Sequence, residues 1–116
     1  MFWEVIQCSD FSEEFKSFPV ELQDEILIHQ EMLSQYGPQL GRPCVDTIKC
    51  SNLPNLKELR FNWSRQPYRF FYVFDPLRRA VVLNGGCKSG DKLFYKRLIH
   101  TAETRYRRYL VEEGLQ

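Results

Sequence analysis

Two arginines lie within segments whose composition is otherwise that of sheet strands. Arg60 ends the run LKELR, and Arg69 stands in YRFFYVFD among aromatic and aliphatic residues. Because side chains alternate along a strand, Glu58 shares a face with Arg60. If the two segments pair as a hairpin with Arg60 near Arg69, two cations converge on one surface. Like charges directly opposite one another are destabilising, so an anion or Glu58 is expected between them.

A structural explanation of the same arginines is also open. Each could lay its aliphatic stem over the sheet and pair with a nearby acid, such as Glu58 or Asp75. Spacing alone does not separate an anion-binding site from internal ion pairs of this kind. Both interpretations are therefore kept as hypotheses for Arg60 and Arg69.

A second group of candidate functional residues lies in the segment GGCKSGDKLFYKR. In this segment Tyr95 is surrounded by Lys88, Lys92, Lys96 and Arg97. The segment lacks the Gly-x-x-x-x-Gly-Lys-Ser/Thr spacing of a P-loop. A glycine-bearing loop that leads into a helix can still bind an anion through backbone N–H groups. Lysines around a tyrosine also suit phosphate binding and base stacking. The alternative is a Tyr95 that faces the core, with the lysines in solvent.

Other chemistries find little support in the sequence. The four cysteines lack the paired spacing of a zinc site, and the two histidines stand far from them in helix-like segments. No histidine is placed near a serine in a way that suggests a catalytic triad. We therefore predict neither a metal site nor a cofactor. The residues concerned are Cys8, Cys44, Cys50, Cys87, His29 and His100.

These side chains need a scaffold, and the hydrophobic pattern predicts one. The elements follow the order β-α-α-β-β-β-β-α, in which short connections between strands favour antiparallel pairing. The expected strands are residues 2–7, 45–51, 55–61, 68–75 and 80–86. The expected helices are a short one with Asp10 as its N-cap, 20–36, and 92–112 with Asp91 as its N-cap. The predicted class is α+β, a small twisted antiparallel sheet with two N-terminal helices and one C-terminal helix.

Length and composition predict one domain that spans residues 1–116. Apolar residues make up 43% of the chain, which is enough for a core. No window approaches the roughly eighteen uncharged apolar residues of a membrane span. The first residues, MFWEVIQCSDF, lack the features of a signal peptide. We therefore expect a cytoplasmic protein without a membrane span.

Charge is distributed unevenly along the chain, although the net charge is only +1. Residues 1–41 hold one basic residue against eight acidic ones, a net −7. Residues 42–116 hold fifteen basic residues against seven acidic ones, a net +8. This asymmetry suggests a surface that faces a polyanion. Alternatively, the charges of solvated helix faces cancel in three dimensions.

Several motifs, taken in order, resemble a known family. The segments LGRPCVDTIKCSNLPNLKELRF, PYRFFYVFDPLRRAVVLNGG and KSGDKLFYKRLIHTAETRYRRYL resemble the HigB-type, phage-derived toxins of the RelE/ParE superfamily. The resemblance is close from Leu40 to Leu110 and looser over the two N-terminal helices. It implies the toxin of a type II toxin–antitoxin pair. The α+β order of that family agrees with the order that the hydrophobic pattern predicts.

The resemblance also implies an activity and two kinds of partner. Superfamily members typically enter the ribosomal A site and cut mRNA without a metal. The ribose 2′-OH attacks the adjacent phosphodiester, which leaves a 2′,3′-cyclic phosphate and a free 5′-OH. The usual protein partner is a helix-turn-helix antitoxin of the HigA type, which blocks the active face.

The family motifs assign roles to particular residues. Arg69 matches the arginine of the superfamily's Tyr-Arg strand, and Arg60 is the second candidate for phosphate contact. Tyr95 aligns with the tyrosine at the start of the last helix and serves as acid, base or stacking platform. Glu58 is a candidate base. Lys88, which stands where members often carry Arg or His, would stabilise charge or hold backbone phosphate, and the acid–base assignment stays open.

Further cations are expected to contact the RNA outside the reacting phosphate. Lys57 is also an alternative to Glu58 as the base. Cys50 and Cys87 depart from the family pattern, and no role follows for them. The predicted RNA-binding residues are Lys57, Lys92, Lys96 and Arg97.

Two other functions are compatible with the same fold. ParE-like members of the superfamily inhibit DNA gyrase and cut no RNA, and an inactive homologue would only bind an antitoxin or RNA. The convergence of the two arginines with Lys88 and Tyr95 favours the nuclease, because a gyrase inhibitor does not need it. The acidic segment 21–31 is expected to bind a basic stretch of the antitoxin.

Overall fold

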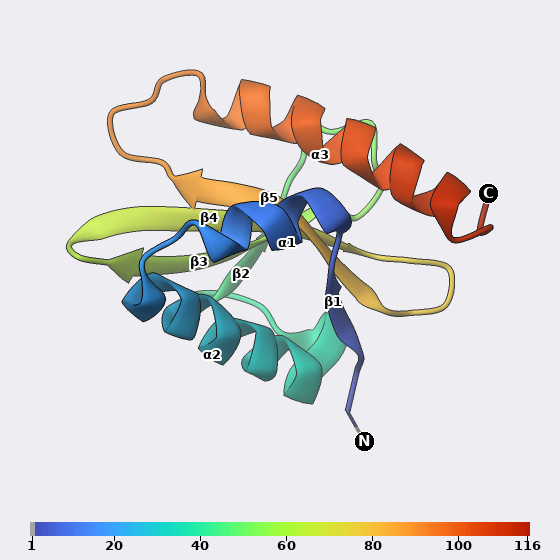
Figure 1. The fold of residues 1–116 in the computed structure, drawn as a ribbon, viewed down its shortest axis with the longest axis horizontal. Helices are drawn as coiled ribbons and strands as arrows, with labels where there is room; N and C mark the ends of the chain where they lie inside the picture. The colour runs from blue at the N-terminus through green and yellow to red at the C-terminus, as the bar shows by residue number, and fades with distance from the viewer. Residues whose placement is uncertain (1) are drawn as a thin grey trace.

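The sheet has five strands in the order β1-β5-β4-β3-β2 (Figure 1), in a computed structural model that describes residues 2–116. The strands are β1 (Val5–Gln7), β2 (Val45–Thr47), β3 (Lys57–Trp63), β4 (Gln66–Phe74) and β5 (Ala80–Cys87). The helices are α1 (Ser9–Lys16), α2 (Val20–Tyr36), the short 3-10 helix η1 (Gly37–Gln39) and α3 (Phe94–Glu112). The predicted α+β class, with two N-terminal helices and one C-terminal helix, is confirmed.

Helices cover both faces of the sheet, with α3 on one face and α2 on the other (Figure 1). Two consecutive residues of β4 show how the layers are built. Phe70 packs against Phe11 of α1, with ring centroids 5.8 Å apart. Phe71 packs against Phe94 and Tyr95 of α3, at 6.1 and 6.0 Å. Because side chains alternate along a strand, β4 buries aromatic residues on both faces, which accounts for its long apolar run.

The sheet is mixed rather than wholly antiparallel. Strands β2, β3, β4 and β5 pair with antiparallel neighbours, as their short connections predict. Strand β1 pairs parallel with β5, with Val5 opposite Ala80. The argument from short connections does not apply to β1, because α1, α2, η1 and three strands separate it from β5 along the chain.

Ion pairs join α1 to α3. Asp10 contacts Arg108, and its Oδ2 lies 3.5 Å from Nε of Arg105. Nη2 of Arg105 also donates to Oε2 of Glu14 at 2.6 Å. The predicted N-cap role of Asp10 is therefore wrong, because α1 already begins at Ser9 and the carboxylate binds the arginines of α3. These pairs cancel part of the charge asymmetry between the N-terminal third and the rest of the chain.

Helix α3 begins two residues later than the sequence predicts, because Asp91 forms a turn ahead of the helix. Its Oδ1 accepts the N–H of Leu93 at 3.0 Å, and its backbone carbonyl accepts the N–H of Phe94 at 3.2 Å. The predicted N-cap at Asp91 is wrong for the same reason, since Leu93 precedes the first helical residue. Across residues 2–116, the helices lack the combination of length and apolarity needed to cross a membrane.

Candidate active site

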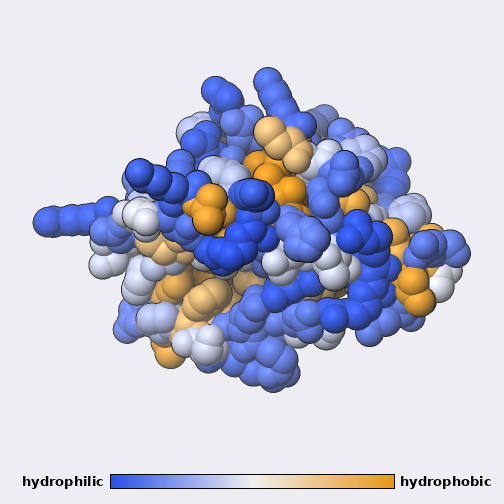
Figure 2. Space-filling model, turned by 90° about the horizontal axis from the view of Figure 1, so that it is seen from above, coloured by the Kyte–Doolittle hydropathy of each residue, from blue (hydrophilic) through white to orange (hydrophobic). Residues whose placement is uncertain are grey.

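The hairpin of β3 and β4 brings the two arginines together. Its register places Arg60 directly opposite Arg69, which meets the condition under which the two cations converge. Glu58 stands opposite Phe71, and Phe71 contacts α3, so this face of the hairpin looks toward that helix. Viewed from the α3 side, the surface is largely hydrophilic with small apolar patches (Figure 2). One sheet face therefore carries two cations and a carboxylate close to the helix.

Arg69 is buried, with only 8% of its surface exposed. Its Nη1 donates to the carbonyl of Tyr68 at 2.9 Å, and its Nε lies 3.7 Å from Oε1 of Glu58. Within the part of the chain that the structure describes, that Nε has no hydrogen-bond partner. A buried guanidinium with an unused N–H is costly in free energy, so an anion that reaches it gains a strong contact.

Arg60 lies beside a third strand. Its Nη1 is 3.8 Å from Oδ2 of Asp46, which stands on β2 opposite Glu58. Nη2 of Arg42 donates to the same Asp46 oxygen at 2.8 Å. The hydrogen bond from Arg42, followed by the backbone N–H of Thr47, holds the pKa of Asp46 below its usual range. An ionised Asp46 therefore accompanies Arg60.

The two arginines have internal acids and unused donors at the same time. Glu58 lies near Arg69 and Asp46 near Arg60, so the structural hypothesis of internal pairing holds in part. Nε of Arg60, like that of Arg69, is buried without a hydrogen-bond partner among residues 2–116. Asp75, the other acid expected near the arginines, instead accepts hydrogen bonds from the β4–β5 turn and from α3. The internal acids therefore contact only part of each guanidinium group.

Tyr95 connects α3 to this cluster. Its hydroxyl donates to Oε1 of Glu58 at 2.8 Å. Burial raises the pKa of Glu58, although the hydrogen bond from Tyr95 and the charge of Arg69 oppose the rise. Burial also raises the pKa of Tyr95, and the bond to Glu58 adds to that effect. A carboxyl with a raised pKa is a stronger base when ionised, which is what proton abstraction requires.

Lys88 completes the cluster from the loop between β5 and α3. Its Nζ lies 5.6 Å from the centroid of the Tyr95 ring, a cation–π contact. Its backbone N–H donates to the carbonyl of Pro67 at 2.8 Å, which ties the start of the loop to β4. The structure thus brings all five predicted catalytic residues together. They are Arg69, Arg60, Tyr95, Glu58 and Lys88.

Lys57 lies apart from this cluster. It is the neighbour of Glu58 on β3, so its side chain leaves from the opposite face of the strand. It lines a separate cavity with Trp3, Phe74 and Arg78. The structure therefore does not bring Lys57 to Glu58 and the arginines, and its contact with RNA stays a prediction.

The other three predicted RNA-binding residues are spread over the loop and the first turns of α3. Lys92 and Lys96 are exposed to solvent. Arg97 is also exposed and forms an ion pair with Asp91. These cations can reach a polyanion that lies along the start of α3, but they do not converge on Arg69.

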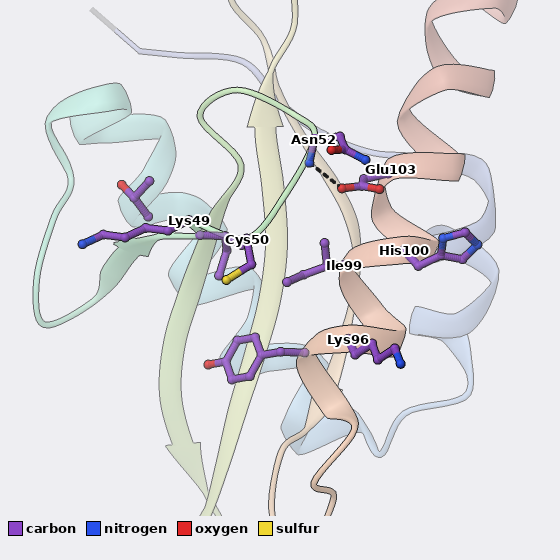
Figure 3. Close-up of a pocket in the computed structure, with 10 residues that line it drawn as sticks. Lys49, Cys50, Asn52, Lys96, Ile99, His100 and Glu103 are labelled. Atoms are coloured by element: carbon purple, nitrogen blue, oxygen red, sulfur yellow. Dashed lines mark hydrogen bonds between the residues drawn. The ribbon is translucent and has the colours of Figure 1, made fainter.

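Sequence reasoning missed Asp46 and a cavity beside Tyr95. Asp46 could have been found, because the expected strand 45–51 neighbours the strand that carries Glu58. The cavity has a volume of about 520 Å³ and lies between the loop after β2 and α3. Cys50 and Ile99 face each other across it (Figure 3). The cavity depends on the path of the irregular loop after β2, and the sequence has no pattern that predicts this path.

Three comparisons place the chain among known sequences. Residues 13–107 match the family described as "Phage derived protein Gp49-like (DUF891)". The candidate toxin HigB3 of Mycobacterium tuberculosis (strain ATCC 25618 / H37Rv) is 39% identical over 84 residues, which cover 72% of this chain and 72% of that protein. The candidate toxin HigB2 of the same strain is 37% identical over 84 residues, which cover 71% of this chain and 42% of that protein. The chain thus spans less than half the length of HigB2.

Proposed function

Because the chain belongs to the Gp49-like family of phage-derived proteins and is a HigB-type toxin of a toxin–antitoxin system, we propose that it is a ribosome-dependent endoribonuclease that cleaves mRNA. The substrate is mRNA in the ribosomal A site, and the result is an arrest of translation in the cytoplasm. The reaction class follows from the resemblance to the RelE/ParE superfamily. The geometry of the cluster supports it independently.

The observation that carries this proposal is the buried guanidinium of Arg69 with an unused Nε–H, next to the hydrogen-bonded pair of Glu58 and Tyr95. Phosphodiester cleavage by an internal hydroxyl needs fixed positive charge at the phosphate and a base near that hydroxyl. Both requirements are met within one cluster on the face of the hairpin that looks toward α3. A surface that served only to bind a protein would not need a buried arginine beside a hydrogen-bonded carboxylate and tyrosine.

In the proposed reaction, the scissile phosphate lies against Arg69 and Arg60, whose guanidinium groups donate to its oxygens. The ribose 2′-OH gives its proton to the hydroxyl of Tyr95 as Tyr95 passes its own proton to Glu58. The 2′-oxygen bonds to phosphorus, the bond to the 5′-oxygen breaks, and the Lys88 ammonium protonates that leaving oxygen. The products are a 2′,3′-cyclic phosphate and a free 5′-OH, and the arginines stabilise the charge that grows on the phosphate oxygens.

A reconstituted translation reaction tests the proposal. The 5′ ends of a reporter mRNA are mapped for the wild type and for Arg69→Ala, with and without ribosomes. Arg78→Ala is the matched control, because Arg78 is exposed in the β4–β5 turn outside the cluster. We expect cuts that require ribosomes, fall by about 10²–10³-fold in Arg69→Ala and persist in Arg78→Ala.

Intact mRNA would overturn the proposal if induction of the wild-type protein still stops growth. A gyrase supercoiling assay would then be the next measurement, since ParE-like members of the superfamily act there. Cleavage that is equal in Arg69→Ala and the wild type would instead show that Arg69 takes no part in the reaction. Circular dichroism of each variant checks that loss of cleavage does not reflect loss of fold.

The partner of the toxin is an antitoxin, and we propose a helix-turn-helix protein of the HigA type with a basic segment that lies along α2. Glu21, Asp24 and Glu31 are exposed on this helix, and among residues 2–116 none of them forms an ion pair with a lysine or arginine. Leu27 and Ile28 beside them are 47% and 55% exposed. A basic amphipathic segment matches both the charge and the apolar area of this face.

A further inference from the structure

The cavity of about 520 Å³ adjoins the cluster through a single residue. Tyr95 forms part of the cavity wall, and the hydroxyl of the same side chain is bonded to Glu58. The cavity opens between the loop after β2 and α3 (Figure 3). The arginines lie on the sheet face that looks toward α3, which is the same side. A nucleotide whose phosphate lies at the arginines can therefore place a neighbouring base in this space.

Most of the cavity wall suits a flat, weakly polar ring. Ile48, Ile99 and the ring of Tyr95 line it, with Cys50 facing Ile99 across the space (Figure 3). Proteins read single-stranded RNA by accepting splayed bases onto aromatic and apolar surfaces and by binding the edges of the bases. The volume falls in the range of small-ligand sites, roughly 300–1,000 Å³. One base fits without rearrangement of the fold.

A single buried charge, Glu103, stands at one end of the cavity. Only 7% of its surface is exposed, and its Oε2 accepts hydrogen bonds from Oγ of Ser51 at 2.8 Å and from the N–H of Asn52 at 2.7 Å. Burial opposes ionisation, but the hydrogen bonds from Asn52 and Ser51 outweigh it and hold the pKa of Glu103 below its usual range. Both bonds go to Oε2, and neither uses Oε1. Figure 3 shows the carboxylate directed toward the loop at Asn52.

We propose that this cavity binds one unstacked base of the RNA beside the scissile phosphate and prefers bases that carry an exocyclic amino group. The inference rests on the proposed function and names a sequence preference for it. The carboxylate of Glu103 accepts an N–H from the amino group of adenine, cytosine or guanine. Uracil has one N–H between two carbonyl oxygens, and the carboxylate repels those oxygens. Uridine is therefore disfavoured at this position.

Titration with the four 5′-monophosphates AMP, CMP, GMP and UMP tests the inference without any cleavage. The backbone amides of Asn52 and Ile99 report on the cavity in a two-dimensional NMR spectrum. We expect the three amino-bearing nucleotides to bind about fivefold more tightly than UMP, the magnitude of one net hydrogen bond. Glu103→Gln keeps an oxygen for Ser51 and the Asn52 N–H but removes the charge, so it should abolish the preference. Cys50→Trp fills the cavity from an exposed position and should abolish binding.

Control variants separate this inference from the proposed function. Arg69→Ala should remove cleavage and keep binding in the cavity, because Arg69 does not line it. Glu13→Gln, which neutralises an exposed carboxylate on α1, should leave the base preference unchanged. Equal binding of UMP to the wild type, or unchanged binding in Cys50→Trp, would overturn the inference even if the protein cleaves mRNA. The spectrum of each variant reports its fold, and Cys50→Phe replaces Cys50→Trp if the tryptophan is not tolerated.

Discussion

The pKa of Glu58 depends on its burial and on its charged and hydrogen-bonding neighbours, which shift it in opposite directions. Only 5% of its surface is exposed, and burial raises its pKa against the effects of Tyr95, Arg69 and Arg60. The folded state therefore binds this proton more tightly than the unfolded chain does. The stability that Glu58 contributes is present in full below its unfolded pKa and is lost as the pH rises through its folded pKa. The cluster thus gives up some stability to keep a strong base at neutral pH.

This protonation predicts the pH dependence of the proposed reaction. The single-turnover rate of mRNA cleavage should rise as the pH passes through the raised pKa of Glu58 and then level off. Glu58→Gln should lower the rate by about 10²–10⁴-fold and remove that acidic limb, because the amide cannot take the proton.

The control for this prediction is Glu112→Gln, which changes an exposed acid at the far end of α3 and should keep both the rate and the limb. An acidic limb that survives in Glu58→Gln would assign the base to another group. The same pH series on Arg69→Ala would separate an effect on phosphate binding from an effect on the base.

At the scale of the element, β5 must approach β4 closely beside Arg69. A Cβ at Gly85 would lie 2.2 Å from the ring of Phe70 and 2.4 Å from the carbonyl oxygen of Arg69. The carbonyl oxygen is part of the backbone, so it cannot move without shifting β4 itself, and the Phe70 ring is fully buried in the core. The glycine therefore sets the spacing of the two strands at the point where the arginine is positioned.

Gly85→Ala should accordingly destabilise the protein by about 1–3 kcal/mol, the usual cost of overpacking. Gly86→Ala is the matched control on the same strand, because a Cβ there meets no atom within 4 Å. Urea denaturation followed by circular dichroism measures both free energies of unfolding. Equal values for the two variants would show that β5 can move away from β4 at no cost.

The elements that sequence patterns predicted well are those defined by their own residues. Helix α2 has the expected bounds, and β4 was correctly identified from its aromatic run. The errors concern partners distant in the chain. Asp10 and Asp91 have the residue type of an N-cap, but one binds arginines of α3 and the other forms a turn. Likewise, the pattern of β1 indicates a strand without indicating that its neighbour is β5.

At the scale of the whole molecule, the acids of the N-terminal third fall into two groups. Those of α1 are partly neutralised within the fold, since Asp10 and Glu14 bind arginines of α3. Those of α2 point to solvent, and Glu21 and Glu31 are exposed. Of these two helices, α2 is therefore the one that keeps unpaired negative charge on the surface of the folded protein.

This division predicts which acids bind the antitoxin. The double variant Glu21→Gln/Glu31→Gln should weaken the complex by about fivefold, since exposed charge pairs each contribute a fraction of 1 kcal/mol. Added salt should weaken the wild-type complex more than the variant complex. Isothermal titration calorimetry at two salt concentrations measures both effects. Glu13→Gln on α1 is the control, and a salt-independent complex would place the interface elsewhere.

Sequence patterns could predict only those parts of the candidate site that depend on neighbouring residues in the chain. Alternation placed Glu58 and Arg60 on one face, and the structure adds the hairpin register that puts Arg60 opposite Arg69. The bond from Tyr95 to Glu58 depends on where α3 crosses the sheet, so sequence patterns pointed to the tyrosine but not to its partner. The base cavity joins an irregular loop to a helix some fifty residues away in the chain, as the contact of Ser51 with Glu103 shows. No local pattern reports a contact of that kind.

The contribution of α3 to the cluster has a consequence for the order of events during synthesis. The ribosome produces the arginine hairpin before Tyr95, and the hydroxyl that bonds to Glu58 arrives only when α3 emerges and docks. A nascent chain therefore displays the paired cations without the acid–base pair. The proposed acid–base pair is therefore complete only after the last helix of the chain has been made.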